Sequence, residues 1–197
     1  MSHPSHNVLI LNGHPDPASK GLCHALAEAY GEGAQQAGHA IRRIDVAALA
    51  FGFLHSQAEF EKAAPPPDIA AAQQDIEWAD HLVVIFPLWL GDMPALLKAF
   101  FEQALRPGFA FDYGAKGLPI MHLKGKSARI VVTMGMPAFV YRWYFRAHGV
   151  KNLKRNILRF VGFSPVRDTL LGGVGTLGKE KIGQVLEGVR TLGRRAL

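Results

Sequence analysis

Three short loops hold most of the side chains of this sequence that could take part in chemistry. Each loop follows an apolar run typical of a buried strand. The first loop spans residues 13–21 and leads into an expected helix, whose free backbone N–H groups can bind an anion. His14, Ser19 and Lys20 add side-chain donors that suit a phosphate. The alternative is an ordinary turn in which Ser19 only caps the helix.

The second loop, residues 86–94, is apolar and aromatic. A strand end that carries Trp89, Leu90 and Met93 can form one wall of a flat aromatic pocket. Gly91 would allow the backbone to approach a ligand closely. The alternative is that Trp89 belongs to the core.

The third loop, residues 133–141, offers backbone donors for the polar edge of a ring and the phenol of Tyr141. His148 follows and would share the rim of this loop if the chain bends at Gly149. A structural role is the alternative for both side chains.

Two standard phosphate-binding patterns do not explain the sequence. The pattern GxxxxGK[ST] is absent. Residues 173–178 match GxGxxG, but no strand and acidic residue follow at the distance that a dinucleotide fold requires. We interpret this segment as a turn.

The elements that must position the three loops are short apolar runs alternating with helical patterns. This alternation predicts an α/β fold, with a five-stranded parallel sheet covered by helices on both faces and the strand order 2-1-3-4-5. Ligands bind beyond the carboxyl ends of such strands, where the three loops would lie. The expected strands are Asn7–Asn12, His39–Val46, His81–Phe86, Ala128–Thr133 and Val166–Leu171. The expected helices are Ser19–Gly38, Asp68–Asp80, Met93–Leu105, Phe139–Phe160 (interrupted near Gly149) and Lys179–Ala196, with a loop over Phe51–Ala64 and a Gly-rich excursion over Pro107–Lys126.

Length and composition limit the class of protein. A chain of 197 residues suits a single domain over 1–197, and 49% hydrophobic residues exclude a disordered chain. A single cysteine, Cys23, excludes an intramolecular disulfide and a multi-cysteine metal site, and we expect no metal. With no apolar run long enough for a membrane helix and no signal-peptide pattern, we expect a cytoplasmic protein.

The charge balance is basic, with 22 Lys and Arg against 16 Asp and Glu and a formal net charge of +6. A basic segment runs from Arg142 to Arg159, and no acid lies between Phe139 and Arg167. Such a segment is either a solvated face or a surface that attracts nucleotide phosphates or an acidic partner. We expect no nucleic-acid binding, because no recognition motif accompanies it.

Read together, the loops resemble the flavodoxin-like NAD(P)H:quinone oxidoreductase family, which includes bacterial quinone reductases, modulators of drug activity and ancillary flavoproteins of potassium-efflux systems. The matching pieces occur in the family's order across roughly residues 7–175. They are Gly13-His14 with Ser19, Phe86-Pro87-Leu88 with Met93 to Lys98, Gly108 to Phe111, Thr133-x-Gly135 with Tyr141, and Phe160-x-Gly162-Phe163.

The resemblance implies a flavodoxin-like three-layer sandwich that binds FAD or FMN, with FAD preferred. It implies NAD(P)H as co-substrate and two-electron, ping-pong hydride transfer to a quinone-like acceptor. Tyr141 matches the family's active-site tyrosine, and His148 matches its histidine if one residue is inserted. The implied flavin-binding residues are His14, Ser19, Lys20, Gly21, Pro87, Leu88, Trp89, Leu90, Gly91, Thr133, Met134, Gly135 and Met136.

The family also implies a homodimer whose second subunit completes the pocket. Two other functions stay open: a regulatory flavoprotein that docks on a membrane transporter, and an FMN electron carrier. The sequence departs from the family at Lys20-Gly21, where Phe-Asn is common, and at Trp89-Leu90-Gly91, where a polar-aromatic sequence is usual.

Overall fold

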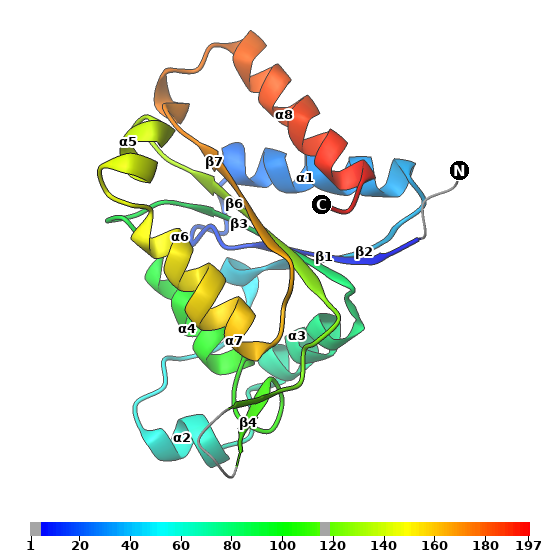
Figure 1. Cartoon of the computed structure of the whole chain (residues 1–197), viewed down its shortest axis with the longest axis vertical. Helices are drawn as coiled ribbons and strands as arrows, with labels where there is room; N and C mark the ends of the chain where they lie inside the picture. The colour runs from blue at the N-terminus through cyan, green and yellow to red at the C-terminus, as the bar shows by residue number, and fades with distance from the viewer. Residues whose placement is uncertain (1–4, 115–118) are drawn as a thin grey trace.

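A five-stranded parallel sheet forms the centre of the molecule (Figure 1). The computed structural model describes residues 5–114 and 119–197. The strand order β2-β1-β3-β6-β7 confirms the predicted order 2-1-3-4-5. The strands are β1 (Asn7–Asn12), β2 (Ala40–Asp45), β3 (His81–Pro87), β6 (Ser127–Thr133) and β7 (Val166–Leu171).

Alternate side chains of the sheet enter two different cores. In β1, Val8 and Ile10 pack under helices α1 and α8, whereas Leu9 and Leu11 pack against the helices of the opposite face. Both faces are therefore buried, as the continuous apolar run of β1 predicts. Figure 1 shows α1 and α8 on one side of the sheet and α3, α4, α6 and α7 on the other. Their bounds are α1 (Leu22–Gln36), α3 (Pro67–Trp78), α4 (Ala95–Ala104), α6 (His148–Asn152), α7 (Arg159–Val161) and α8 (Lys179–Arg194).

The helices α1 and α8 touch through glycines. A Cβ on Gly33 of α1 would lie 1.9 Å from the carbonyl oxygen of Arg190, and one on Gly193 of α8 would lie 2.1 Å from that of Tyr30. Only a residue without a side chain allows the two backbones to approach this closely.

The first expected helix begins later than the sequence suggests, and Ser19 is not its cap. The helix starts at Leu22 after Gly21, which makes no side-chain capping bond. Ser19 instead accepts a hydrogen bond from the N–H of Gly21, at 3.3 Å. The reason is a turn around Asp16, whose carboxylate and carbonyl oxygens accept from the N–H groups of Ala18 and Ser19 and so delay the helix.

The helix expected over 139–160 is broken. Its first part, α5 (Ala138–Trp143), is separated from α6 by Arg146 and Ala147, which have left-handed φ angles of 55° and 50°. A π-helical segment, η2 (Leu153–Leu158), then joins α6 to α7. The break thus lies just before Gly149.

Two loop predictions were incomplete. Segment 51–64 contains a short helix, α2 (Gln57–Lys62), whose N-terminal N–H of Glu59 is capped by Ser56. The excursion over 107–126 contains an antiparallel pair, β4 (Phe111–Tyr113) and β5 (Pro119–Met121). Residues 115–118 of this excursion lie outside the described residues. Residues 1–4, at the N-terminus where we expect no signal peptide, lie outside them as well. Two 3₁₀ turns, η1 (Val46–Ala48) and η3 (Val174–Thr176), complete the described elements.

Candidate functional site

The three loops leave the carboxyl edge of the sheet side by side, as predicted. The N–H of Leu88 in the second loop donates to the carbonyl of Thr133 at 2.8 Å, and that of Met134 in the third loop donates to Leu171 at 2.9 Å. The N–H of Gly13, where the first loop begins, donates to Ile85 of β3 at 2.7 Å. Each loop is thus anchored to the strand beside its own.

The first loop lines a cavity of about 160 Å³ at the ends of β1 and β2. His14 and Ser19 line it, while the side chain of Lys20 is exposed beside it. Asn12 and Asp45 close its floor, and the amide of Asn12 donates to the Asp45 carboxylate at 2.8 Å. This polar pair was not among the predicted site residues, although its place at the ends of two neighbouring parallel strands could have indicated it.

The second loop is a tight turn with an exposed apolar tip. The N–H groups of Trp89 and Asp92 each donate to the other's carbonyl, at 2.9 and 3.0 Å. Leu90 and Gly91 between them have φ angles of 48° and 83°, so Leu90 adopts a conformation that favours glycine or asparagine. Trp89 is 52% exposed and Leu90 is fully exposed, so the alternative of Trp89 as a core residue is wrong.

The first two loops also meet through their side chains. The rings of His14 and Trp89 lie edge to face, with centroids 6.5 Å apart. The indole therefore stands next to the first loop.

In the third loop, the predicted site residues divide into two groups. Thr133 and Met134 are buried, and the hydroxyl of Thr133 lies 3.4 Å from Sγ of Cys23, facing the interior. Gly135 is exposed and Met136 is half-buried. Any ligand contact in this loop therefore involves Gly135, Met136 and backbone groups rather than the hydroxyl of Thr133. Pro87 and Leu88, in the second loop, are half-buried at the sheet edge.

The segment 173–178 lies against the third loop. The N–H of Gly173 donates to the carbonyl of Met136 at 3.0 Å, and that of Val174 donates to Met134 at 3.2 Å. A Cβ on Gly172 would lie only 2.1 Å from the backbone nitrogen of Ala138. Gly172 was not among the predicted site residues, although a glycine directly after a predicted strand is a signal of close approach.

Tyr141 is 1% exposed, and its hydroxyl joins two segments. It donates to the carbonyl of Gly91 at 3.1 Å and accepts from the N–H of Val150 at 3.3 Å. Burial raises the pKa of this phenol, so it stays protonated at neutral pH. Because it donates to the Gly91 carbonyl and accepts from the Val150 N–H, the hydroxyl joins the tip of the second loop to α6. A catalytic role for Tyr141 stays a prediction.

A hollow of about 740 Å³ opens where the second loop meets α6. Leu90, Gly91, Tyr141 and the exposed His148 line it, so the predicted tyrosine and histidine face one space. Its remaining lining residues are Asp92, Phe145, Arg146, Gly149, Lys151, Asn152, Arg155 and Asn156.

A doubly wound parallel sheet whose loops meet at its carboxyl edge belongs to the class of open α/β folds in which ligands bind at that edge. The chain belongs to the family described as having a flavodoxin-like fold, whose model matches residues 6–192.

Three proteins to which the chain is similar carry oxidoreductase names. The chain is 32% identical over 144 residues to NAD(P)H dehydrogenase [quinone] 1 of Rattus norvegicus, which covers 68% of this chain and 50% of that protein. It is 31% identical over 109 residues to an FMN-dependent NADH:quinone oxidoreductase of Haemophilus influenzae, covering 55% and 52%. The chain thus spans about half the length of these two relatives. The structure of an NAD(P)H:quinone oxidoreductase from Methanothermobacter marburgensis superimposes with a TM-score of 0.81 at 26% identity, covering 98% of this chain and 97% of that one.

Among the helices of the described residues, none combines the length and the apolar character needed to cross a membrane.

Proposed function

We propose that the chain binds FMN at the carboxyl edge of its sheet and reduces quinone-like acceptors with NAD(P)H. The observation that carries this proposal is the exposed Trp89–Leu90 turn, whose indole lies beside His14 of the first loop and whose neighbour Leu88 is hydrogen-bonded to Thr133 of the third. The turn has a strained backbone and exposes apolar side chains to water. Both costs are offset when the turn covers a flat ring.

The residues present fit a flavin in three places. The phosphate suits the N-terminus of the 15-residue helix α1, with Ser19 and Lys20 beside it. The ring suits the wall made by Trp89 and Leu90. The polar edge of the ring suits the backbone around Gly135, where a developing negative charge would be stabilised.

We propose FMN in place of FAD. The H. influenzae relative is named FMN-dependent, and the preference for FAD finds no support in the named relatives. A bound flavin would supply the hydride chemistry, taking two electrons from NAD(P)H and giving them to the acceptor.

The protein's own residues would bind, orient and donate. Tyr141 acts as a positioning residue that holds the turn of Gly91. His148, exposed on the rim of the hollow, is within reach of a substrate held there and donates a hydrogen bond to its oxygen. Donor and acceptor would use the same hollow in turn, which gives ping-pong kinetics. The homodimer, the single-domain organisation and the transporter partner stay predictions.

Visible absorption of the purified protein tests the function. After incubation with FMN or FAD and removal of the excess, we expect a stoichiometric flavin spectrum that NAD(P)H bleaches and a quinone restores. Folded protein that retains neither flavin would overturn the proposal. Retention of FAD alone would overturn the choice of FMN.

A pair of ligands tests the phosphate loop. FMN and riboflavin differ only in the phosphate, so Lys20→Gln should weaken FMN binding about tenfold and leave riboflavin binding within twofold. Lys62→Gln, on the exposed helix α2, is the matched control. Equal loss for both flavins would show that Lys20 does not act on the phosphate.

A further inference from the structure

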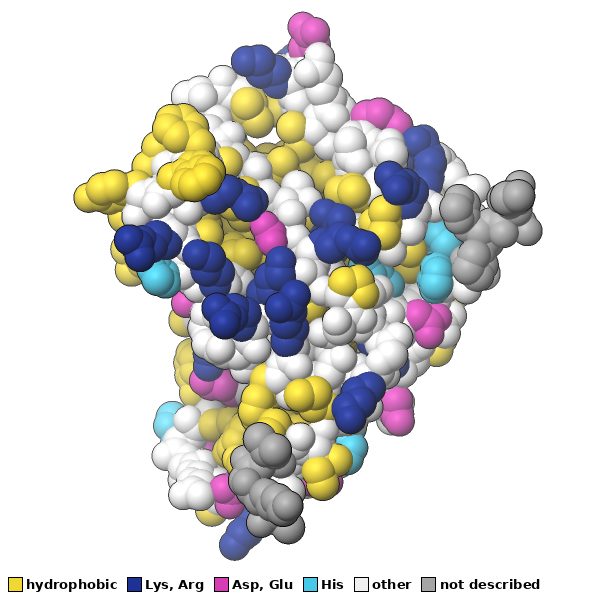
Figure 2. Space-filling model, viewed as in Figure 1, with side chains coloured by type: hydrophobic (Ala, Val, Ile, Leu, Met, Phe, Trp, Pro, Cys, Tyr) yellow, Lys and Arg dark blue, Asp and Glu magenta, His cyan; other side chains and the backbone are white. Residues whose placement is uncertain are grey.

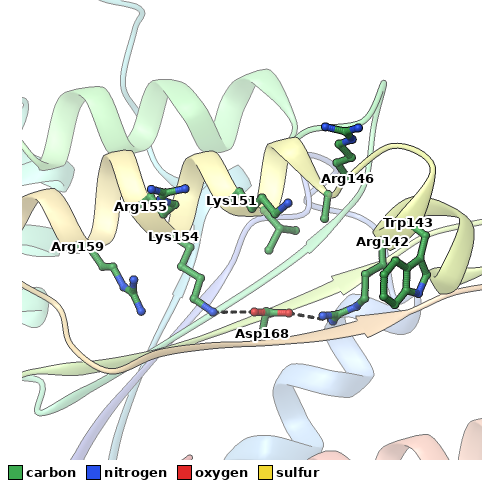
Figure 3. A pocket seen from close by; sticks show the side chains of 10 residues that line it. Arg142, Trp143, Arg146, Lys151, Lys154, Arg155, Arg159 and Asp168 are labelled. Carbon is green, nitrogen blue, oxygen red and sulfur yellow. Dashed lines mark hydrogen bonds and ion pairs between the residues drawn. The ribbon is translucent and has the colours of Figure 1, made fainter.

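A second hollow, of about 770 Å³, lies beside the candidate site, between the α5–α7 segment and the edge strand β7 (Figure 3). It is strongly basic. Its lining residues are Arg142, Trp143, Arg146, Ala147, Val150, Lys151, Lys154, Arg155, Arg159 and Asp168.

One carboxylate, that of Asp168, lies within this lining and already has two partners. Lys154 contacts it at 2.9 Å and Arg142 at 3.1 Å. Burial opposes its ionisation, but the hydrogen bond and charge of Lys154, together with Arg142, outweigh burial and lower the pKa of Asp168. The group is therefore a carboxylate at neutral pH, and it neutralises part of the positive charge around it.

The other cations of this hollow have no acidic partner within 4 Å in the part of the chain that the structure describes. The sequence explains why, since no Asp or Glu occurs from Tyr113 to Arg167. Figure 2 shows the result as dark blue side chains gathered around a single magenta group over the α6–α7 segment. The cations concerned are Arg146, Lys151, Arg155 and Arg159.

This basic hollow borders the candidate site, because three cations line both. Arg146, Lys151 and Arg155 line both it and the hollow that holds Tyr141 and His148. A ligand whose reactive end lies at Tyr141 can thus extend along this shared rim and keep its charged end among the cations.

We propose that the basic hollow binds the phosphate-bearing adenosine half of NADPH, including its 2′-phosphate. This inference rests on the proposed function. Cations without acidic partners match a ligand with several phosphate charges, and the volume lies in the range of small-molecule pockets. Trp143, 79% exposed at the rim, offers a face to the adenine base. NADH lacks the 2′-phosphate and would gain less from the same cations.

Kinetics with the two nucleotides test the proposal. The double variant Arg155→Gln/Arg159→Gln should raise the KM ratio of NADPH to NADH about tenfold or more, since each charge-assisted hydrogen bond contributes about a factor of ten. The matched control, Lys62→Gln/Lys124→Gln, removes the same charge from exposed lysines outside both hollows and should leave the ratio within twofold. An unchanged ratio in the first variant would overturn the proposal.

A binding experiment needs no turnover. Adenosine 2′,5′-bisphosphate, titrated into the purified protein by calorimetry, should bind, compete with NADPH and lose affinity in the double variant. Failure to bind, or binding that does not compete with NADPH, overturns the inference. Loss of flavin retention overturns the proposed function instead, so the two failures are distinguishable.

Discussion

At the scale of single residues, Tyr141 illustrates how a site residue can be found and its contacts missed. The family resemblance implied a place for it at the site, and the structure brings it to the same hollow as His148. Its burial and the hydrogen bond of its hydroxyl to Gly91 depend on a segment 50 positions away in the chain. Local sequence patterns do not predict such a contact. The contact of Thr133 was not predictable from local patterns either, since its hydroxyl lies 3.4 Å from Sγ of Cys23, far away in the chain.

The variant Tyr141→Phe tests this positioning role. It leaves the Gly91 carbonyl and the Val150 N–H without their partner, so the free energy of unfolding should fall by about 1–2 kcal/mol. Flavin affinity should fall with it, because the turn of Leu90 is released. Urea unfolding and a flavin titration measure both effects.

Tyr144→Phe is the control for this variant, since Tyr144 is exposed, and its stability should stay within about 0.5 kcal/mol of wild type. The opposite pattern for Tyr141→Phe, with stability and flavin affinity unchanged and kcat alone reduced, would make the phenol a catalytic donor.

At the scale of elements, the strands were predictable and the broken helix was not. Continuous apolar runs identify the three central strands β1, β3 and β6, and the crossover rules for five parallel strands favour the observed order. The chain restarts as α6 where it meets the second loop: a Cβ on Gly149 would lie 2.5 Å from the Gly91 carbonyl, so the backbones approach closely there. The hydrophobic periodicity of one segment does not predict a contact with a distant loop.

Gly172, at the end of β7, is the corresponding close approach for the third loop. In Gly172→Ala the new Cβ would meet backbone atoms of Ala138 and Met136 at 2.1 and 2.7 Å, which side-chain rotation does not relieve. We expect a loss of about 1–3 kcal/mol in unfolding free energy and weaker flavin binding, measured as for Tyr141.

Gly175→Ala, where a Cβ meets nothing within 4 Å, should change neither quantity. If both alanine variants behave like wild type, the third loop does not depend on close contact with β7.

At the scale of the whole molecule, a buried histidine couples stability to pH. His81 is 1% exposed, and burial, followed by the charge of Arg129, lowers its pKa to about 3 from an ordinary value of 6.5. Its Nδ1 lies 2.7 Å from the hydroxyl of Ser127. The His81 imidazole therefore binds a proton near pH 6.5 in the unfolded chain, but only near pH 3 in the folded chain.

Stability should consequently fall as the pH decreases through this window, by up to about 1.4 kcal/mol per pH unit from His81 alone. Urea unfolding at a series of pH values measures the slope, and His81→Phe, which keeps a ring beside Tyr30, should reduce it between pH 6 and 4. An NMR titration that finds an ordinary pKa for His81 in the folded protein would contradict this account.

The glycine contact between α1 and α8 has a consequence for biosynthesis. The apolar side of α1 is covered by a helix that lies more than 140 residues later in the chain. A ribosome adding roughly 5–20 residues per second therefore leaves α1 without this cover for roughly 7–30 seconds. During that interval the nascent chain exposes the apolar side of α1, which is the kind of surface that chaperones recognise.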